Sequence, residues 1–174
     1  MGRIRTGRLS AKMKKEAVGL GLCEQWQGEW ADDASKDDMA EKFVKGQDFC
    51  IEHDWPGVEV IKRNFGDVMH RHGVYADETF EAEGLQSLIM VGRCEGKLKV
   101  DGRGVSSVYV RHNSRLHVEA SGDARVFVRL YDKAAVEVES SGGARVFVYT
   151  YSEGTKVSGS YFKLSARPQG WDTV

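Results

Sequence analysis

The sequence predicts an α+β protein in which a small N-terminal helical module precedes a short β-solenoid. Three observations lead to this fold class: a twenty-residue repeat in the C-terminal half, apolar residues at helical spacing in the N-terminal half, and turn residues that recur between short β segments. An antiparallel β-meander or sandwich is the alternative. We expect four segments in chain order: a flexible basic arm at 1–15, a helical module at 16–73, a β-repeat (solenoid) domain at 74–164 and a C-terminal tail at 165–174.

Charge is distributed unevenly along the chain of 174 residues, although the net charge is −1. Residues 1–15 carry six basic and no acidic side chains, residues 16–95 carry 18 acidic and 7 basic ones, and residues 96–174 carry 8 acidic and 12 basic ones. A basic terminal segment is typical of a flexible electrostatic contact. We expect this arm to contact an acidic surface, such as nucleic acid, a capsid lining or a partner protein, through Arg3, Arg5, Arg8, Lys12, Lys14 and Lys15.

Residues 16–72 predict three short amphipathic helices. Ser35, followed by Asp37 and Asp38, predicts the start of the second helix, because serine caps helices and acids favour the first turn. The segment Trp55-Pro56-Gly57 separates the second helix from the third. The apolar positions are, in chain order, Val18, Leu22 or Cys23, Trp26 and Trp30; Met39, Phe43, Gly46 and Cys50; Val58, Ile61, Phe65 and Val68 or Met69.

The twenty-residue repeat predicts the β domain. The sequence SGDARVFV at 121–128 returns as SGGARVFV at 141–148, and a looser copy, LKVDGRGVSSVYVRHNSR, occupies 98–115. Residues 85–91 are a strand candidate that starts this region. Near-identity at a constant offset favours stacked parallel coils over a meander, since each coil then repeats the same bends.

Side chains alternate between the two faces of a strand, so each copy presents an inner and an outer set. Valine and leucine are expected inside at Leu98/Val100, Leu116/Val118, Val136/Val138, Val108/Val110, Val126/Val128 and Val146/Val148. If the coils stack, one outer face carries the acids Asp101, Glu119 and Glu139. The other carries an aromatic ladder flanked by arginines, which gives these candidate partner-binding residues: Tyr109, Arg111, Arg125, Phe127, Arg129, Arg145, Phe147 and Tyr149.

Outward phenylalanine in successive copies predicts a covered surface, because a solvated face seldom repeats an exposed aromatic residue. In one interpretation, the acidic helical segment folds back over this face. In the other, the face is open and binds another protein or single-stranded nucleic acid, because aromatic rings interleaved with arginines suit base stacking and phosphate contact.

The sequence contains few signs of catalytic or metal chemistry. Three widely spaced cysteines form no CxxC pair, so neither a disulfide framework nor a zinc site is expected. The GxSxG, HExxH and P-loop motifs do not occur, and turns of about five residues are too short to enclose a substrate. We therefore expect no enzyme activity, cofactor, metal site, small-molecule substrate or membrane segment.

The Leu/Val-x-Val strands and Gly/Ser corners of residues 98–157, as in LHVEASGDARVFV, resemble short bacterial β-solenoids such as the polymer-forming bactofilins and auto-adhesin-like head domains. The stretch GLCEQWQGEW…FCIEHDWP is similar to small uncharacterised proteins carried by bacterial phages and mobile elements. The first resemblance implies a stacked-coil fold. The second implies a virion component or an accessory protein that acts on a host machine.

These observations together predict a non-catalytic protein-interaction or assembly component, of phage or mobile-element origin, with a rigid β-repeat platform and a basic arm. A protein partner or self-association is expected, with nucleic acid reached through the arm. The alternative is a nucleic-acid-associated accessory protein or an inhibitor of a host machine. The expected location is the bacterial cytoplasm or the virion.

Overall fold

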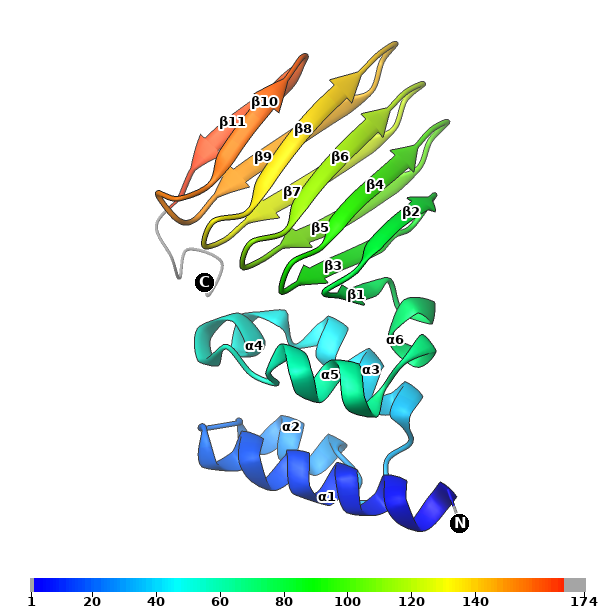
Figure 1. Cartoon of the computed structure of the whole chain (residues 1–174), viewed down its shortest axis with the longest axis vertical. Helices are drawn as coiled ribbons and strands as arrows, with labels where there is room; N and C mark the ends of the chain where they lie inside the picture. The colour runs from blue at the N-terminus through cyan, green and yellow to red at the C-terminus, as the bar shows by residue number, and fades with distance from the viewer. Residues whose placement is uncertain (1, 168–174) are drawn as a thin grey trace. The chain divides into compact units, whose positions relative to one another are not determined.

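The computed structural model describes residues 2–167, with side chains from residue 6 onward. It divides into two compact units, Met1–His72 and Gly73–Val174. Helices form the first unit and parallel strands wound into a solenoid form the second (Figure 1). The predicted fold class, a helical module followed by a β-solenoid, is confirmed.

After α1 (Gly2–Gly19), the helical unit contains more and shorter helices than the three that the sequence predicts for residues 16–72. The predicted second helix is divided at Gly46, and the third is divided at Gly66, where a φ of +52° places the backbone in a region that favours glycine. At Gly46, a Cβ would lie 3.1 Å from the carbonyl oxygen of Lys42. The helices are α1 Gly2–Gly19, α2 Glu24–Glu29, α3 Lys36–Lys45, α4 Gln47–His53, α5 Val58–Asn64 and α6 Asp67–Arg71.

Helix α1 corrects the prediction of a flexible arm over residues 1–15. Alanine, lysine and methionine favour the helix, and it buries Ser10, Met13 and Ala17, which are spaced three and four residues apart. The Ser10 hydroxyl donates to the carbonyl oxygen of Ala31 at 2.9 Å and accepts from the indole Nε1 of Trp30 at 3.0 Å. The basic segment is therefore part of the packed helical unit from Thr6 onward.

The predicted N-terminus of the second helix is confirmed at Ser35. The Ser35 hydroxyl accepts a hydrogen bond from the backbone N–H of Asp38 at 3.1 Å, and the Asp38 carboxylate accepts from the Ser35 N–H, which completes a capping box. The Ser35 hydroxyl also donates to the Asp38 carboxylate at 2.7 Å, and this bond, together with the one from the Ser35 N–H, holds the pKa of Asp38 below its usual value. One residue earlier, Asp37 pairs with Arg71 at 2.9 Å, so α3 is tied to the end of α6.

Replacing Ser35 with alanine is expected to lower the free energy of unfolding of the helical unit by about 1 kcal/mol near neutral pH. Because the folded pKa of Asp38 is lowered, its contribution is present above the unfolded pKa and is lost as pH falls through the folded one. Urea unfolding of the full chain, followed by circular dichroism, measures both effects. The difference between variant and wild type should shrink in acid. The exposed Ser158 supplies a control, since Ser158→Ala should change stability by less than about 0.5 kcal/mol.

Tryptophans line an apolar cavity of about 280 Å³ inside the helical unit. Trp30 is buried and packs its ring 6.3 Å from that of Trp55. Trp26 is half-buried, with the ammonium of Lys42 lying 5.6 Å from its ring centroid. The interpretation of Trp26 and Trp30 as core residues therefore holds for Trp30, while Trp26 stays partly exposed.

The solenoid consists of two parallel sheets that face each other (Figure 1). One sheet has the order β1-β3-β5-β7-β9-β11 and the other β10-β8-β6-β4-β2, so the chain alternates between the sheets at each corner. The strands are β1 Val74–Ala76, β2 Thr79–Glu83, β3 Ser87–Val91, β4 Glu95–Val100, β5 Val105–Val110, β6 Arg115–Ala120, β7 Arg125–Leu130, β8 Ala135–Ser140, β9 Arg145–Thr150, β10 Lys156–Gly159 and β11 Phe162–Ala166.

Every residue predicted to face inward is buried, and all twelve belong to one continuous apolar core between the sheets. Ser106, which is fully buried, is a polar exception on β5. At the far end of the stack, Phe162 packs against the core, but Leu164 is 56% exposed and Tyr161 83% exposed. Of these three residues, Phe162 is therefore the one that packs against the core.

The register between coils corrects the predicted alignment of the copy at 98–115 with the next copy. Aligning LKV at 98–100 with LHV at 116–118 gives an offset of eighteen residues, whereas the structure pairs Leu98 with Val118 and Val108 with Val128, at an offset of twenty. Inner residues remain inner because a shift of two preserves the side-chain alternation. The outer neighbours change, and this alters both predicted ladders.

The corners explain why the offset between paired strands is constant at twenty from β3 to β9. At one corner, Gly102, Gly122 and Gly142 occupy equivalent positions with φ between +60° and +66°, which favours glycine. At the opposite corner, His112 and Asp132 adopt positive φ, and their side chains accept hydrogen bonds from backbone N–H groups one coil earlier. Each coil thereby fixes the bends of its neighbour.

Candidate functional site

The outer face of the β1-containing sheet is rich in aromatic and basic side chains. We call it the aromatic–arginine face; its residues, on β5, β7 and β9, are Tyr109, Arg125, Phe127, Arg129, Arg145, Phe147 and Tyr149. None of the outward positions of β5, β7, β9 and β11 carries an acid in the part of the chain that the structure describes. The face therefore combines ring surface with positive charge.

The rings on this face are arranged in columns that the parallel register sets. Phe127 pairs with Phe147, and their rings stack with centroids 5.2 Å apart and planes inclined by 9°. Tyr109 pairs with Arg129, so the predicted ladder of Tyr109, Phe127 and Phe147 is wrong in its first member. Ser107 occupies the position before Phe127 in that column.

Cationic side chains cover or flank the rings. The Arg129 guanidinium lies 5.0 Å from the centroid of Tyr109 and donates to the Ser107 hydroxyl at 3.1 Å. The ammonium of Lys163 lies 6.0 Å from the centroid of Phe147, within the range of a cation–π contact. Arg125 and Arg145 remain exposed beside the half-buried phenylalanines.

Arg111 is a correction to the predicted partner-binding set. It follows β5 at a corner and is 3% exposed, so it is not part of an outer, accessible face. The equivalent positions in the next coils hold Tyr131 and Tyr151, which are buried and stack with centroids 4.7 Å apart. This column is internal to the corners of the solenoid.

The predicted arm residues are spread around α1. Lys14 forms an ion pair with Asp32 at 3.1 Å, and Lys12 lies 3.9 Å from Glu16 on the next helical turn. Arg8 and Lys15 are exposed. The side chains of Arg3 and Arg5 lie outside the described residues, as do positions 168–174 of the predicted tail.

The second outer face, on the sheet that contains β4, β6 and β8, is occupied by charged residues of both signs. We call it the charged face, made of Lys97, Lys99, His117, Glu119, Glu137 and Glu139. Glu119 pairs with Glu139 as predicted, but the residue opposite Glu119 in the preceding coil is Lys99, and Asp101 lies in a turn. The expected acidic ladder therefore contains two acids and one lysine.

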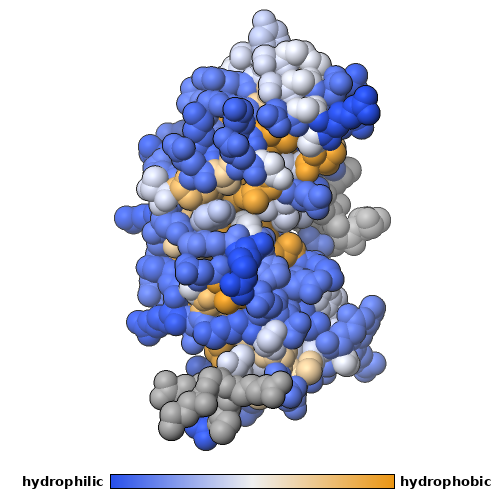
Figure 2. Space-filling view, turned by 90° about the vertical axis from the view of Figure 1, so that its right-hand side faces the viewer, coloured by the Kyte–Doolittle hydropathy of each residue, from blue (hydrophilic) through white to orange (hydrophobic). Residues whose placement is uncertain are grey.

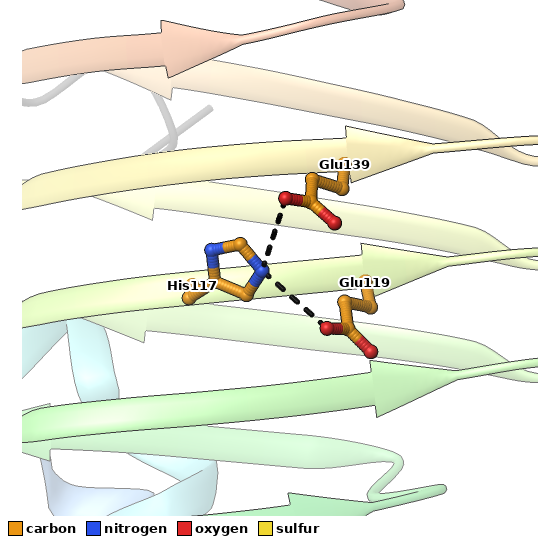
Figure 3. A group of neighbouring side chains, drawn as sticks. All are labelled: His117, Glu119 and Glu139. Atoms are coloured by element: carbon orange, nitrogen blue, oxygen red, sulfur yellow. Dashed lines mark ion pairs between the residues drawn. The ribbon is translucent and has the colours of Figure 1, made fainter.

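Ion pairs on the charged face connect successive coils. Lys97 Nζ lies 2.7 Å from Glu119 Oε1, which raises the pKa of Lys97 and lowers that of Glu119. His117 lies among three carboxylates. Its Nε2 is 3.6 Å from Glu119 and 3.8 Å from Glu139 (Figure 3). Its Nδ1 is 3.4 Å from Glu137. His117, Glu119 and Glu139 are grouped closely enough to hold a metal ion.

Sequence reasoning did not find this cluster. The signal was present as His-x-Glu at 117–119 and Glu-x-Glu at 137–139, exactly one period apart if the offset of twenty is applied. The members of the cluster belong to two coils, so no single stretch of the sequence contains them all.

The corners between the sheets present a different surface. Figure 2 shows the side on which β2, β4, β6 and β8 end, and it is mainly hydrophilic with small, separated hydrophobic areas. Extended apolar patches are the usual mark of a docking surface. The hydrophobic areas on this side are therefore too small and scattered to mark a docking surface.

Comparisons with known proteins give no relative for this chain: no family model matches, and no significant match is found among curated proteins or solved structures. Among the described residues, no helix combines the length and hydrophobicity that a membrane span requires.

Proposed function

We propose that this protein is a non-catalytic binding component whose solenoid is a rigid platform, and that the aromatic–arginine face binds an acidic surface of a protein. The observation that carries the proposal is the stacked pair Phe127–Phe147, half-buried and flanked by exposed Arg125 and Arg145. Aromatic and arginine side chains are the residue types that contribute most to protein interfaces.

The chemistry of the face indicates the kind of partner. Its positive charge has no acid beside it on β5, β7, β9 or β11, so an acidic partner gains attraction at long range and faster association. The ring surface supplies apolar area that a partner can desolvate. A parallel sheet fixed by stacked coils holds these groups at constant spacing, so little ordering is needed on binding.

A non-catalytic role fits the construction of the solenoid. Its corners are short turns, and the outer hollow beside His117 and Glu137 lies open on a sheet face, where water has free access. Catalytic sites usually enclose the substrate and exclude water. Display of a surface is the function that such coils support best.

The repeat itself supplies variants that test the proposal. Ser107 occupies the Phe127 position one coil earlier, and Val105 occupies the Arg125 position, so Phe127→Ser and Arg125→Val reproduce side chains already tolerated there. Fluorescence anisotropy can use a labelled peptide that alternates glutamate and tyrosine as the probe. We expect saturable binding that weakens with salt, and at least a tenfold loss of affinity when both substitutions are combined.

A matched variant on the charged face, Glu137→Gln, should bind the peptide as the wild type does. A labelled oligothymidylate, measured in parallel, decides between the two classes of partner. If the protein binds the oligonucleotide more tightly than the peptide, and the double variant loses this binding, the partner is single-stranded nucleic acid and not a protein. Absence of binding to the peptide at low salt would overturn the proposal. Sedimentation velocity of the same proteins shows whether a second copy of the chain is the partner.

A further inference from the structure

The charged face contains an arrangement that the binding platform does not need. His117 and Glu119 point outward from β6, and Glu137 and Glu139 point outward from β8 directly beside them. Neighbouring parallel strands lie about 4.8 Å apart, so the register brings the four side chains together. Glu119 and Glu139 place two like charges opposite each other, which is unfavourable without a cation between them.

The distances match a small metal site. The Nε2 atom of His117 lies 3.6 Å from an oxygen of Glu119 and 3.8 Å from an oxygen of Glu139, and the three ligand atoms all lie within 4.8 Å of one another. Tetrahedral zinc with bonds of about 2.1 Å separates its ligand atoms by about 3.4 Å. The Glu139 side chain is 64% exposed and can rotate by the small amount required (Figure 3).

A fourth residue, Glu137, orients the imidazole ring of His117 for metal binding. Glu137 lies 3.4 Å from Nδ1, on the opposite side of the ring from Glu119 and Glu139. A carboxylate that accepts the Nδ1 proton leaves the lone pair on Nε2, directed at the other two carboxylates. Histidine ligands of metals commonly have such a partner, which fixes the tautomer and the ring orientation.

Lys97 competes with a cation at this position. Its ammonium lies 2.7 Å from the same Glu119 oxygen that faces His117. A bound metal ion must take that oxygen from Lys97 or share it. Lys97 therefore tunes the affinity of the site, and its removal should strengthen binding.

We propose that His117, Glu119 and Glu139 bind a divalent transition-metal ion of the Zn²⁺ class, with Glu137 as a positioning residue and water in the open coordination position. An imidazole with two carboxylates favours zinc or cobalt over magnesium, which prefers oxygen ligands alone. The ion would join β6 and β8 across two coils. This inference is independent of the proposed partner-binding role, since it concerns the opposite sheet.

Isothermal titration with ZnCl₂, and visible absorption with CoCl₂, test the site in the full chain. All proteins carry Cys23→Ser, because Cys23 is an exposed thiol that could bind the same ions. We expect one saturable site, no response to MgCl₂, and at least a tenfold weaker affinity in His117→Ala and in Glu139→Gln. Glu137→Gln should weaken binding about tenfold, and Lys97→Met should strengthen it several-fold.

Matched controls separate the site from general charge effects. Glu81→Gln removes an acid from the same face two coils away, Lys99→Met removes a neighbouring base, and His72→Ala removes a histidine of the helical unit. Each should leave the zinc affinity within about twofold of wild type, because Coulomb effects at exposed positions are small. Unchanged affinity in His117→Ala, with a normal circular dichroism spectrum, would overturn the proposal. So would a wild type that shows no saturable zinc site.

Discussion

Replacing Leu98 with alanine is expected to lower the free energy of unfolding of the solenoid by about 3 kcal/mol. Leu98 is fully buried on β4 and belongs to the continuous core between the two sheets. Shortening it removes buried apolar area and leaves a cavity that its neighbours cannot fill, because the hydrogen bonds of adjacent coils hold the strands in place. The expected loss therefore lies in the upper part of the range of free energies that a leucine side chain gains when it passes from an exposed to a buried position.

Denaturant unfolding of the full chain measures this effect, with circular dichroism and amide hydrogen exchange of β4 and β6 as separate probes. Leu164 provides the control, because it is 56% exposed on β11. Leu164→Ala should change stability by about 0.5 kcal/mol or less. Equal effects of the two substitutions would mean that the core does not stabilise the coils as described.

Replacing Gly159 with alanine should have the second large effect, about 3 kcal/mol. Gly159 ends β10 with a φ of +109°, and a Cβ there would overlap the backbone of Val138 on the neighbouring strand. Alanine therefore meets both an unfavourable backbone conformation and a steric clash. The expected result is separation of β10 from β8, with faster hydrogen exchange at Ser158 and Ser160.

Gly102 separates these two causes. Its φ of +60° is also unfavourable for alanine, but a Cβ there meets nothing within 4 Å. Gly102→Ala should cost only the conformational part, about 1 kcal/mol. A Gly159→Ala protein as stable as Gly102→Ala would show that β10 can move away from Val138 without loss.

The alternation of apolar residues along each strand and the twenty-residue period of the sequence predicted most of the solenoid. Valines two residues apart in each copy fix which side faces inward, and those positions are buried in every copy. The N-terminal cap at Ser35 could also be predicted from local sequence, because a serine followed by acids forms its capping hydrogen bonds within the first turn of the helix. These features depend on residues that are close in sequence.

The register of the looser copy could not be predicted by aligning similar letters. Gly96 occupies the inward position that Leu116 and Val136 fill in later coils, and the Phe80 and Met90 side chains take up the space that a Cβ would need. The coil that contains β4 therefore keeps the offset of twenty to the next coil while losing the motif. Constant corners and interstrand hydrogen bonds determine the pairing, and neither is visible in a leucine–valine pattern.

The same limitation explains two further differences. Helix α1 buries a narrow strip that includes Ser10, a polar residue, so its sequence lacks a strong amphipathic pattern. Arg111 continues the alternation of β5 in sequence, but the chain turns there and carries it into a corner. Both outcomes depend on tertiary packing, which overrides local pattern.

The period of twenty also has a consequence for how quickly the solenoid folds. Parallel sheets usually assemble slowly, because distant segments must meet before any strand pairs. Here the pairs β4–β6, β5–β7, β6–β8 and β7–β9 each join residues twenty apart, so closing one coil brings the next strand into place. The entropy of loop closure depends weakly on length and is the same for each added coil. Folding can therefore begin at any of these coils and extend in both directions, at a rate closer to that of helical proteins than to that of most β proteins.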